Sequence, residues 1–223
     1  MKIIKFIKWK YWDFRNPQLK KPFGVIAFVG LPGQGKTLSM VELLDRTKEL
    51  YPELTVGIYT NFGYKGQAGR IRNLQDIIDT PANSIIAIDE TQTIFSSRDW
   101  QNFPAEMLSV VTQHRKKAKQ LLFTGQRFGM LDKNLRELCN FIVECRCLMG
   151  RWFFQKAYLF SDYEKLEGQD DEFKMKHLRW KYSFIASNNL FERYDTFLTI
   201  EGQDFKQNSD GVSTKTQVEN FDI

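Results

Sequence analysis

Long apolar runs, cysteine and histidine are all scarce in this chain of 223 residues. Every apolar cluster ends within about six positions, whereas a membrane-spanning helix needs roughly 18 or more apolar residues. The first twelve residues interrupt their apolar positions with lysines, so they lack the apolar core and the cleavage site of a signal peptide. We therefore expect an intracellular protein that does not cross a membrane unaided.

The three cysteines, Cys139, Cys145 and Cys147, have a spacing that matches no zinc-binding pattern. With only two histidines in the chain, we expect no structural metal site. Cys145 and Cys147 fall on one face of an expected strand, where we expect a reduced and buried pair.

Disorder is also excluded, because 42% of the residues are hydrophobic and 14% are aromatic. Charge is unevenly distributed: the first 25 residues contain seven Lys and Arg but one Asp. We expect residues 1–23 to form a basic, aromatic N-terminal arm. This composition suits an anionic membrane surface, packing on a neighbouring subunit, or contact with DNA, and the sequence leaves these three open.

Apolar, β-branched runs alternate with helix-like segments through most of the chain, which predicts an α/β domain with a mostly parallel sheet. Strands are expected at 24–30, 55–62, 84–90 and 120–126, and helices at 36–50, 73–79, 104–118 and 132–139. The segments 141–149 and 152–160 follow one another without a helix, so they predict an antiparallel hairpin at one edge of the sheet.

The C-terminal third is less regular. We expect an exposed loop over 164–180, a last strand at 181–187 and a helix at 189–197. From 202 to 223 the sequence is polar and without periodicity, which is typical of a flexible tail. The central domain is therefore expected over 24–201.

One motif carries most of the functional information. Residues 30–37, GLPGQGKT, match the phosphate-binding P-loop pattern in full, and they lie between an expected strand and an expected helix. The backbone N–H groups of such a loop bind phosphate, the lysine contacts the β and γ phosphates, and the Thr hydroxyl is a ligand of Mg²⁺. The candidate nucleotide-binding residues are Gly30, Leu31, Pro32, Gly33, Gln34, Gly35, Lys36, Thr37 and Leu38.

Two acidic residues, Asp89 and Glu90, follow the apolar strand SIIAI. Asp89 is the expected second element of the Mg²⁺ site, and Glu90 is the expected general base that polarises the attacking water. A carboxylate beside the metal site favours ATP hydrolysis over phosphoryl transfer to a metabolite. A small-molecule kinase would also need an Arg-rich lid, and the sequence has none at the expected place.

The strand at 120–126 ends in Gln126, which we predict to contact the γ-phosphate or the attacking water as a sensor. Arg115, Arg127 and Arg136 are candidates for a cation supplied to a neighbouring subunit's nucleotide, and the sequence does not choose among them. Residues 115–151 contain nine Lys and Arg against three acidic residues. This density predicts either a surface that grips the phosphate backbone of DNA or an ordinary solvated face.

Together these segments resemble the zonular occludens toxin-type ATPase domain of filamentous phages, in the FtsK-HerA group of P-loop DNA pumps. The resemblance covers about residues 24–160. It rests on the P-loop, Asn61 after a Tyr-Thr strand end, the acid pair followed by Gln92, the Gln113-His114-Arg115 triplet and the Thr-x-Gln strand end. It implies nucleotide binding by Gly30, Gly35, Lys36 and Thr37, Mg²⁺ binding and hydrolysis through Asp89 and Glu90, and a sensor role for Gln126.

The resemblance also implies a function. It predicts a homo-oligomeric, hexameric ring in the cytoplasm of the host cell, which hydrolyses ATP to move phage DNA, package it, or assemble and extrude virions. Members commonly continue into a transmembrane helix, whereas this sequence has a polar tail, so membrane attachment is expected through a partner, through the arm, or not at all. The alternative is an ATP-gated scaffold that acts with a membrane-embedded assembly protein without pumping DNA.

Overall fold

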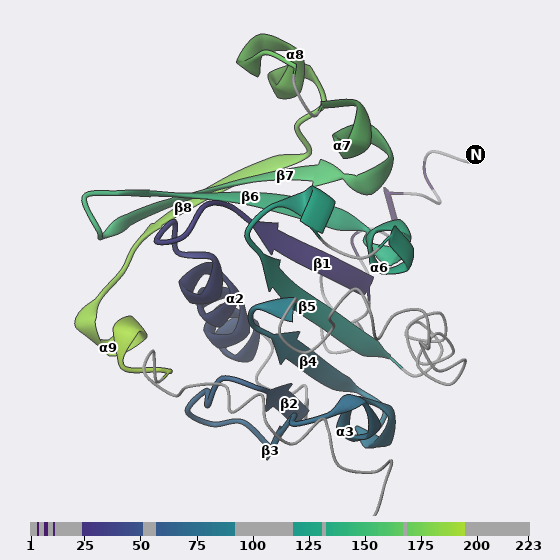
Figure 1. The fold of residues 1–223 in the computed structure, drawn as a ribbon, viewed down its shortest axis with the longest axis vertical. Helices are drawn as coiled ribbons and strands as arrows, with labels where there is room; N and C mark the ends of the chain where they lie inside the picture. Colours follow the sequence, from purple (N-terminus) through teal and green to yellow (C-terminus); the bar gives the residue numbers. More distant parts are fainter. Residues whose placement is uncertain are drawn as a thin grey trace, which may run out of the picture.

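The computed structural model describes residues 24–50, 57–91, 118–130, 133–166 and 169–194, together with Ile4, Ile7, Lys8 and Tyr11. One eight-stranded sheet forms the centre of this part of the chain, in the order β3-β2-β4-β5-β1-β6-β7-β8 (Figure 1). The strands are β1 (Gly24–Val29), β2 (Gly57–Thr60), β3 (Gly69–Arg70), β4 (Ser84–Ile88), β5 (Lys119–Gly125), β6 (Phe141–Leu148), β7 (Trp152–Leu159) and β8 (Trp180–Ile185).

Six of these strands are parallel, and β7 and β8 continue the sheet antiparallel to their neighbours. The fold is therefore the α/β P-loop NTPase fold with an antiparallel edge hairpin, as the sequence predicts. Strand β5 lies between β1, which leads into the P-loop, and β4, which leads into Asp89. The carboxyl ends of all three strands meet at one edge of the sheet, where ligands of open α/β sheets bind.

The helices are α2 (Lys36–Leu50), α3 (Leu74–Asp79), α6 (Lys133–Leu138), α7 (Phe160–Leu166), α8 (Asp171–Lys176) and α9 (Asn188–Phe191). Because side chains alternate along a strand, each buried strand serves two cores. One core joins the sheet to α2 and α9, and the other joins it to α3, α6 and α7. Thus Phe28 packs on the α2 side, whereas Val29 packs on the opposite side. Such near-continuous burial is typical of a parallel sheet covered on both faces.

The C-terminal third differs from the prediction in two places. The expected loop at 164–180 contains the end of α7 and the whole of α8, because the Asp170 side chain accepts a hydrogen bond from the Phe173 N–H and caps α8. The helix expected at 189–197 ends at Phe191, and Tyr194 forms a β-bridge with Tyr64 instead. The helix expected at 104–118, most of the arm and the tail lie outside the described residues.

Lys119 belongs to the basic surface predicted over residues 115–151, but it does not lie at the surface. This side chain is buried at the start of β5, where its ammonium donates to Thr80 Oγ1 at 2.7 Å and lies 3.4 to 3.5 Å from the carbonyl oxygens of Ile78 and Ile77. It therefore binds the last turn of α3, where carbonyl groups are left without helical partners. Arg136 likewise packs over the Phe128 ring.

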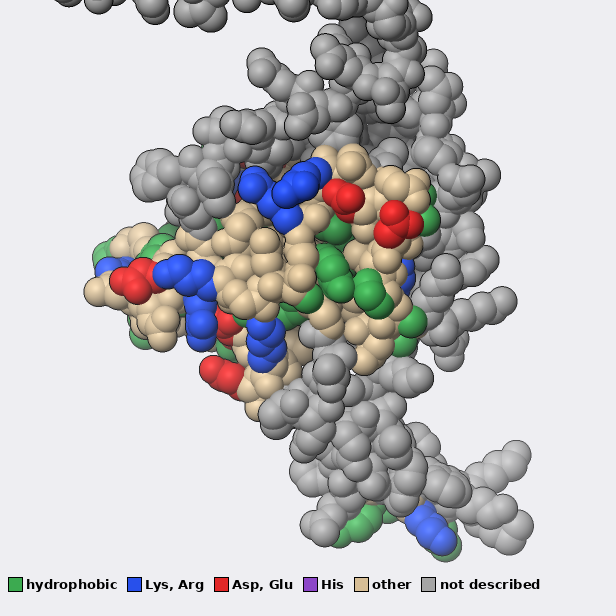
Figure 2. Space-filling view, turned by 90° about the horizontal axis from the view of Figure 1, so that it is seen from below, with side chains coloured by type: hydrophobic (Ala, Val, Ile, Leu, Met, Phe, Trp, Pro, Cys, Tyr) green, Lys and Arg blue, Asp and Glu red, His purple; other side chains and the backbone are tan. Residues whose placement is uncertain are grey.

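The surface on the β2–β3 side of the sheet is mixed in charge. The described part of the face seen in Figure 2 carries basic and acidic side chains in separate small groups, with hydrophobic side chains between them. None of the helices that the structure describes is both long and apolar enough to span a bilayer.

Candidate nucleotide-binding and hydrolysis site

The P-loop connects β1 to α2 at the carboxyl edge of the sheet. Gly33 and Gly35 have φ angles of +77° and +74°, a conformation that strongly favours glycine. The Gln34 N–H donates to the Leu31 carbonyl at 3.2 Å, and the Lys36 ammonium donates to the same carbonyl at 3.1 Å. The loop is thus closed on itself and holds the lysine at its rim, beside the N-terminus of α2.

Gly35 is required for a second reason. A Cβ atom at this position would lie 2.2 Å from Cε1 of Phe153 in β7. The Cys147 N–H of β6 also donates to the Gln34 side chain at 2.9 Å. The β6–β7 hairpin therefore packs directly against the phosphate-binding loop.

Asp89 lies where one helix and two strands converge. Its carboxylate accepts a hydrogen bond from the Thr37 hydroxyl, which lies 2.8 and 2.9 Å from the two carboxylate oxygens. It also accepts a bond from the hydroxyl of Thr124, at the end of β5. The first residues of α2, the end of β4 and the end of β5 thus converge on one carboxylate.

The backbone of Asp89 is held as tightly as its side chain. The Asn61 amide donates to the Asp89 carbonyl at 3.0 Å and accepts from the Asp89 N–H at 2.8 Å. Asn61 is buried and follows β2, the neighbour of β4, so this reciprocal pair extends the β2–β4 pairing beyond the last strand residue.

Glu90 has an unusual backbone. Its φ angle is +47°, and its N–H donates to Thr124 Oγ1 at 2.8 Å. Non-glycine residues rarely adopt this conformation, which costs of order 1 to 3 kcal/mol and concentrates at functional sites. The side chain is exposed and lines a cavity with Lys36, Thr37 and Asp89. The sequence prediction of an acid pair beside the P-loop matches this arrangement.

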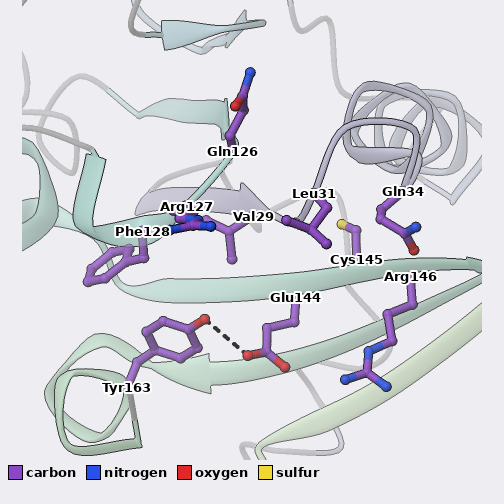
Figure 3. Close-up of a pocket in the computed structure, with 11 residues that line it drawn as sticks. Val29, Leu31, Gln34, Gln126, Arg127, Phe128, Glu144, Cys145, Arg146 and Tyr163 are labelled. Carbon is purple, nitrogen blue, oxygen red and sulfur yellow. Dashed lines mark hydrogen bonds between the residues drawn. The ribbon is translucent and has the colours of Figure 1, made fainter. Parts of the chain in front are cut away.

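Two cavities flank the P-loop. The first, of about 360 Å³, is lined by Lys36, Thr37, Asp89 and Glu90, and also by Phe153, Phe191 and Tyr194. The second, of about 450 Å³, lies between the loop, β6 and α7, and includes Leu31, Gln34, Arg127, Arg146 and Tyr163. In Figure 3 the Tyr163 hydroxyl points at Glu144, to which it donates at 3.0 Å, and Arg146 lies farther along the same strand.

The sequence model of the zonular occludens toxin (Zot) family matches residues 67–179, which is just over half of the chain. The chain belongs to the Zot family.

Two solved structures are similar to this chain. The N-terminal domain of zonular occludens toxin from Neisseria meningitidis is similar with a TM-score of 0.57 and 19% identity, over 79% of this chain and 100% of that one. The genome packaging NTPase B204 of Sulfolobus turreted icosahedral virus 2 has a TM-score of 0.44 and 14% identity, over 64% and 94% of the two chains. No curated protein matches the sequence significantly.

Gln126 and the candidate arginines are the predicted site residues of this Zot-family chain whose positions support a role least directly. Gln126 borders both cavities, and its side chain points away from Glu144 and Arg146 in Figure 3. Arg127 is exposed beside the P-loop, whereas Arg136 packs on Phe128. Arg115, His114, Gln113 and Gln92 lie outside the described residues. The sensor role of Gln126 and the choice of arginine therefore stay predictions.

Thr124 is the residue that sequence reasoning missed. It lies in the Thr-Gly-Gln strand end, from which the sequence predicts Gln126 as the functional residue instead. Thr124 is fully buried, donates to Asp89 and accepts from the Glu90 N–H, and its carbonyl accepts from the Thr91 hydroxyl. A buried hydroxyl at the end of an otherwise apolar strand is a signal in itself, because buried polar groups need partners.

The middle of α2, the helix that begins at Lys36 and Thr37, is held by contacts with β8. Tyr182 of β8 donates to Glu42 at 2.6 Å, and Arg46 lies over the Tyr182 ring. Burial raises the pKa of the Glu42 carboxyl, although the Tyr182 hydrogen bond and Arg46 oppose this. Burial also raises the pKa of the Cys145 thiol to about 12, which keeps it a structural, unreactive group. The predicted buried pair is confirmed for Cys145 only, because Cys147 is half-buried.

Asn61 offers a test of the Asp89 geometry. Asn61→Ala is expected to lower the unfolding free energy by about 1 to 3 kcal/mol, because it leaves the partly buried N–H and C=O of Asp89 without the Asn61 amide. Asn61→Asp keeps an acceptor for the Asp89 N–H but loses the donor, and also places a carboxylate near Asp89. Urea unfolding measures the stability, and a midpoint equal to that of wild type in both variants would contradict the role of the amide pair.

Proposed function

We propose that this Zot-family chain is an ATPase that binds Mg²⁺–ATP at residues 30–38 and hydrolyses it as a motor of phage assembly or packaging. The observation that carries the proposal is the convergence of Thr37, Asp89 and Thr124 at the N-terminus of α2, with Glu90 as the next residue. Family membership supports the phage context.

The triphosphate fits the cavity that contains Lys36. The N–H groups of the loop and the N-terminus of α2 favour negative charge there. Thr37 and Asp89 fit a Mg²⁺ ion, because they bring a hydroxyl and a carboxylate, the hard oxygen ligands that this ion prefers, within hydrogen-bond distance of each other. Bound Mg²⁺ supplies neutralisation of the phosphate charge.

In this proposal Glu90 accepts a proton from the water that attacks the γ-phosphate. Its backbone is fixed through Thr124, so the carboxylate stays on the Lys36 side of the sheet edge. Thr124 is a positioning residue that holds Asp89 and Glu90 together, and Gln126 is proposed as the contact that senses the γ-phosphate. Adenosine fits the second cavity, where Leu31 and Gln34 of the loop face β6.

The finer part of the proposal is that hydrolysis drives DNA translocation in a homo-oligomeric ring. Two exposed arginines of the 115–151 stretch, Arg127 and Arg146, line the cavity beside the P-loop. That location supports contact between cations and phosphate near the hydrolysis site. The partner is phage DNA, bound through its backbone without sequence specificity.

The test is the rate of ATP hydrolysis by the purified chain, with and without single- and double-stranded DNA, with Lys36→Ala as the inactive control. DNA-stimulated hydrolysis that disappears in Lys36→Ala supports a DNA motor. Hydrolysis that depends on Lys36 but ignores DNA supports an ATP-gated scaffold, and no hydrolysis under any condition contradicts the motor proposal.

The scaffold alternative has its own observation. The β6–β7 hairpin, which packs on the P-loop through Phe153 and Cys147, exposes apolar side chains at its end. A partner bound at that end would contact the same two strands that pack against the phosphate-binding loop. In this reading ATP changes the affinity for an assembly partner and no DNA is moved.

A further inference from the structure

The end of the β6–β7 hairpin carries an apolar patch that the hydrolysis site does not use. Four large side chains there are exposed: Leu148 by 47%, Met149 by 91%, Trp152 by 46% and Ile185 by 74%. Trp152 pairs directly with Leu148 on one side and with Ile185 on the other. These three residues form one row across β6, β7 and β8, and Met149 lies in the turn beside it. We call these four residues the tip patch.

The turn holds Met149 in a backbone conformation that is unfavourable for methionine. Met149 has a φ angle of +53°, and Gly150 follows with +69°. Asn and Gly adopt this conformation with little strain, whereas a methionine does not. Among the residues that the structure describes, the most exposed large apolar side chain thus occupies a strained position. Folding alone would favour a small polar residue there, so the side chain points to a binding role.

Positive charge lies directly behind the patch. The next rows on the same sheet face contain Arg146, Phe154 and Ser183, and then Glu144, Lys156 and Lys181. Glu144 already accepts from Tyr163 and lies 4.0 Å from Lys174. Arg146, Lys156 and Lys181 form no ion pair within the part of the chain that the structure describes. The face therefore changes from apolar to basic with distance from the turn.

The spacing of these rows matches a membrane surface. Strand residues rise about 3.4 Å each, which puts the two cationic rows about 7 and 14 Å behind the apolar row. An interfacial segment buries its apolar side chains roughly 5 to 10 Å into the headgroup boundary, where tryptophan concentrates and Lys and Arg meet anionic phosphates. The hairpin also extends beyond the ends of the neighbouring parallel strands, so its turn is accessible to a flat surface (Figure 1).

Single-stranded nucleic acid and a second copy of the chain fit the tip patch less well than a membrane surface does. Single-stranded nucleic acid would need free aromatic faces, but Trp152 and Phe154 lie against each other with ring centroids 4.9 Å apart. Leu148, Met149 and Ile185 offer aliphatic surface, which does not stack on bases. A second copy of the chain would bury the apolar row but would also have to match three unpaired cations.

We propose that the tip patch docks this domain on an anionic lipid surface, with the four apolar side chains at the acyl boundary and Lys156 and Lys181 at the headgroup phosphates. The four residues of the tip patch and the two lysines line neither cavity beside the P-loop, whereas Arg146 borders the second one. Docking does not depend on hydrolysis.

Flotation of the full chain with vesicles tests the proposal. Phosphatidylcholine vesicles containing phosphatidylglycerol are compared with vesicles of phosphatidylcholine alone, without nucleotide. The chain is expected to bind the anionic vesicles at least ten-fold more tightly. Met149→Asn with Ile185→Ser is expected to reduce this binding about ten-fold or more, and Lys156→Gln with Lys181→Gln to remove most of the preference for anionic lipid.

Controls separate a loss of membrane binding from a loss of folding or of general surface hydrophobicity. Met149→Asn relieves the turn, so the unfolding midpoint should stay equal or rise, and ATP hydrolysis should be unchanged. Leu50→Ser removes an exposed leucine at the far end of α2 and should bind vesicles like wild type. Binding that is unaffected by the tip variants overturns the proposal. So does a tip variant that loses DNA binding, or self-association in sedimentation velocity, while vesicle binding is kept.

Discussion

Glu90→Gln is expected to lower kcat for ATP hydrolysis by a factor of roughly 100 to 10,000, the usual contribution of a positioned general base. The amide has the shape of the carboxylate but does not accept the proton of the attacking water. ATP affinity should be almost unchanged, because the loop contacts and the Thr37–Asp89 pair are intact. Single-turnover hydrolysis and equilibrium binding of fluorescent ATP measure the two quantities separately.

The contrast with Lys36→Ala makes this prediction specific. Lys36→Ala removes the cation at the phosphates, so it should weaken ATP binding as well as turnover. Glu90→Gly should raise the unfolding free energy by up to about 1 kcal/mol, because glycine tolerates the positive φ angle at this position, while hydrolysis is lost. Wild-type turnover by Glu90→Gln would show that Glu90 is only a surface residue at a strained turn.

Gly35→Ala is expected to destabilise the fold by about 2 to 5 kcal/mol and to abolish ATP binding. About 1 to 2 kcal/mol comes from the left-handed backbone, and about 1 to 3 kcal/mol from the overlap with the Phe153 ring. Since the ring belongs to β7, relief of the overlap must move either the P-loop or the hairpin. Urea unfolding and ATP binding are the measurements.

Gly33→Ala is the matched control for Gly35→Ala. Its φ angle of +77° is almost the same, but a Cβ atom there would meet nothing within 4 Å. It should therefore show only the backbone cost. Adding Phe153→Leu to Gly35→Ala should recover part of the ATP binding. Equal destabilisation by Gly33→Ala and Gly35→Ala would mean that the hairpin does not constrain the loop.

Much of the site follows from sequence because its chemistry is local. The P-loop needs its glycines, its lysine and its threonine at fixed spacing on one strand–turn–helix unit, and the acid pair needs only the end of an apolar strand. The fold class followed from the alternation of strand and helix patterns, and the structure confirms it. The 164–180 loop was wrong because one capping residue, Asp170, outweighed a charged and Gly-interrupted composition.

Sequence by itself determined what this protein's nucleotide site is made of, because a short contiguous segment supplies each component. Only the tertiary structure decided how the components are held. The insertion of β5 between β1 and β4 brings Thr124 to Asp89, the β2–β4 pairing brings Asn61 to its backbone, and the hairpin brings Phe153 to Gly35. It also buried Lys119 and placed Lys156 and Lys181 in one row behind the tip patch. These contacts join residues far apart in the chain, and strand order and register, which set them, leave no trace in local residue patterns.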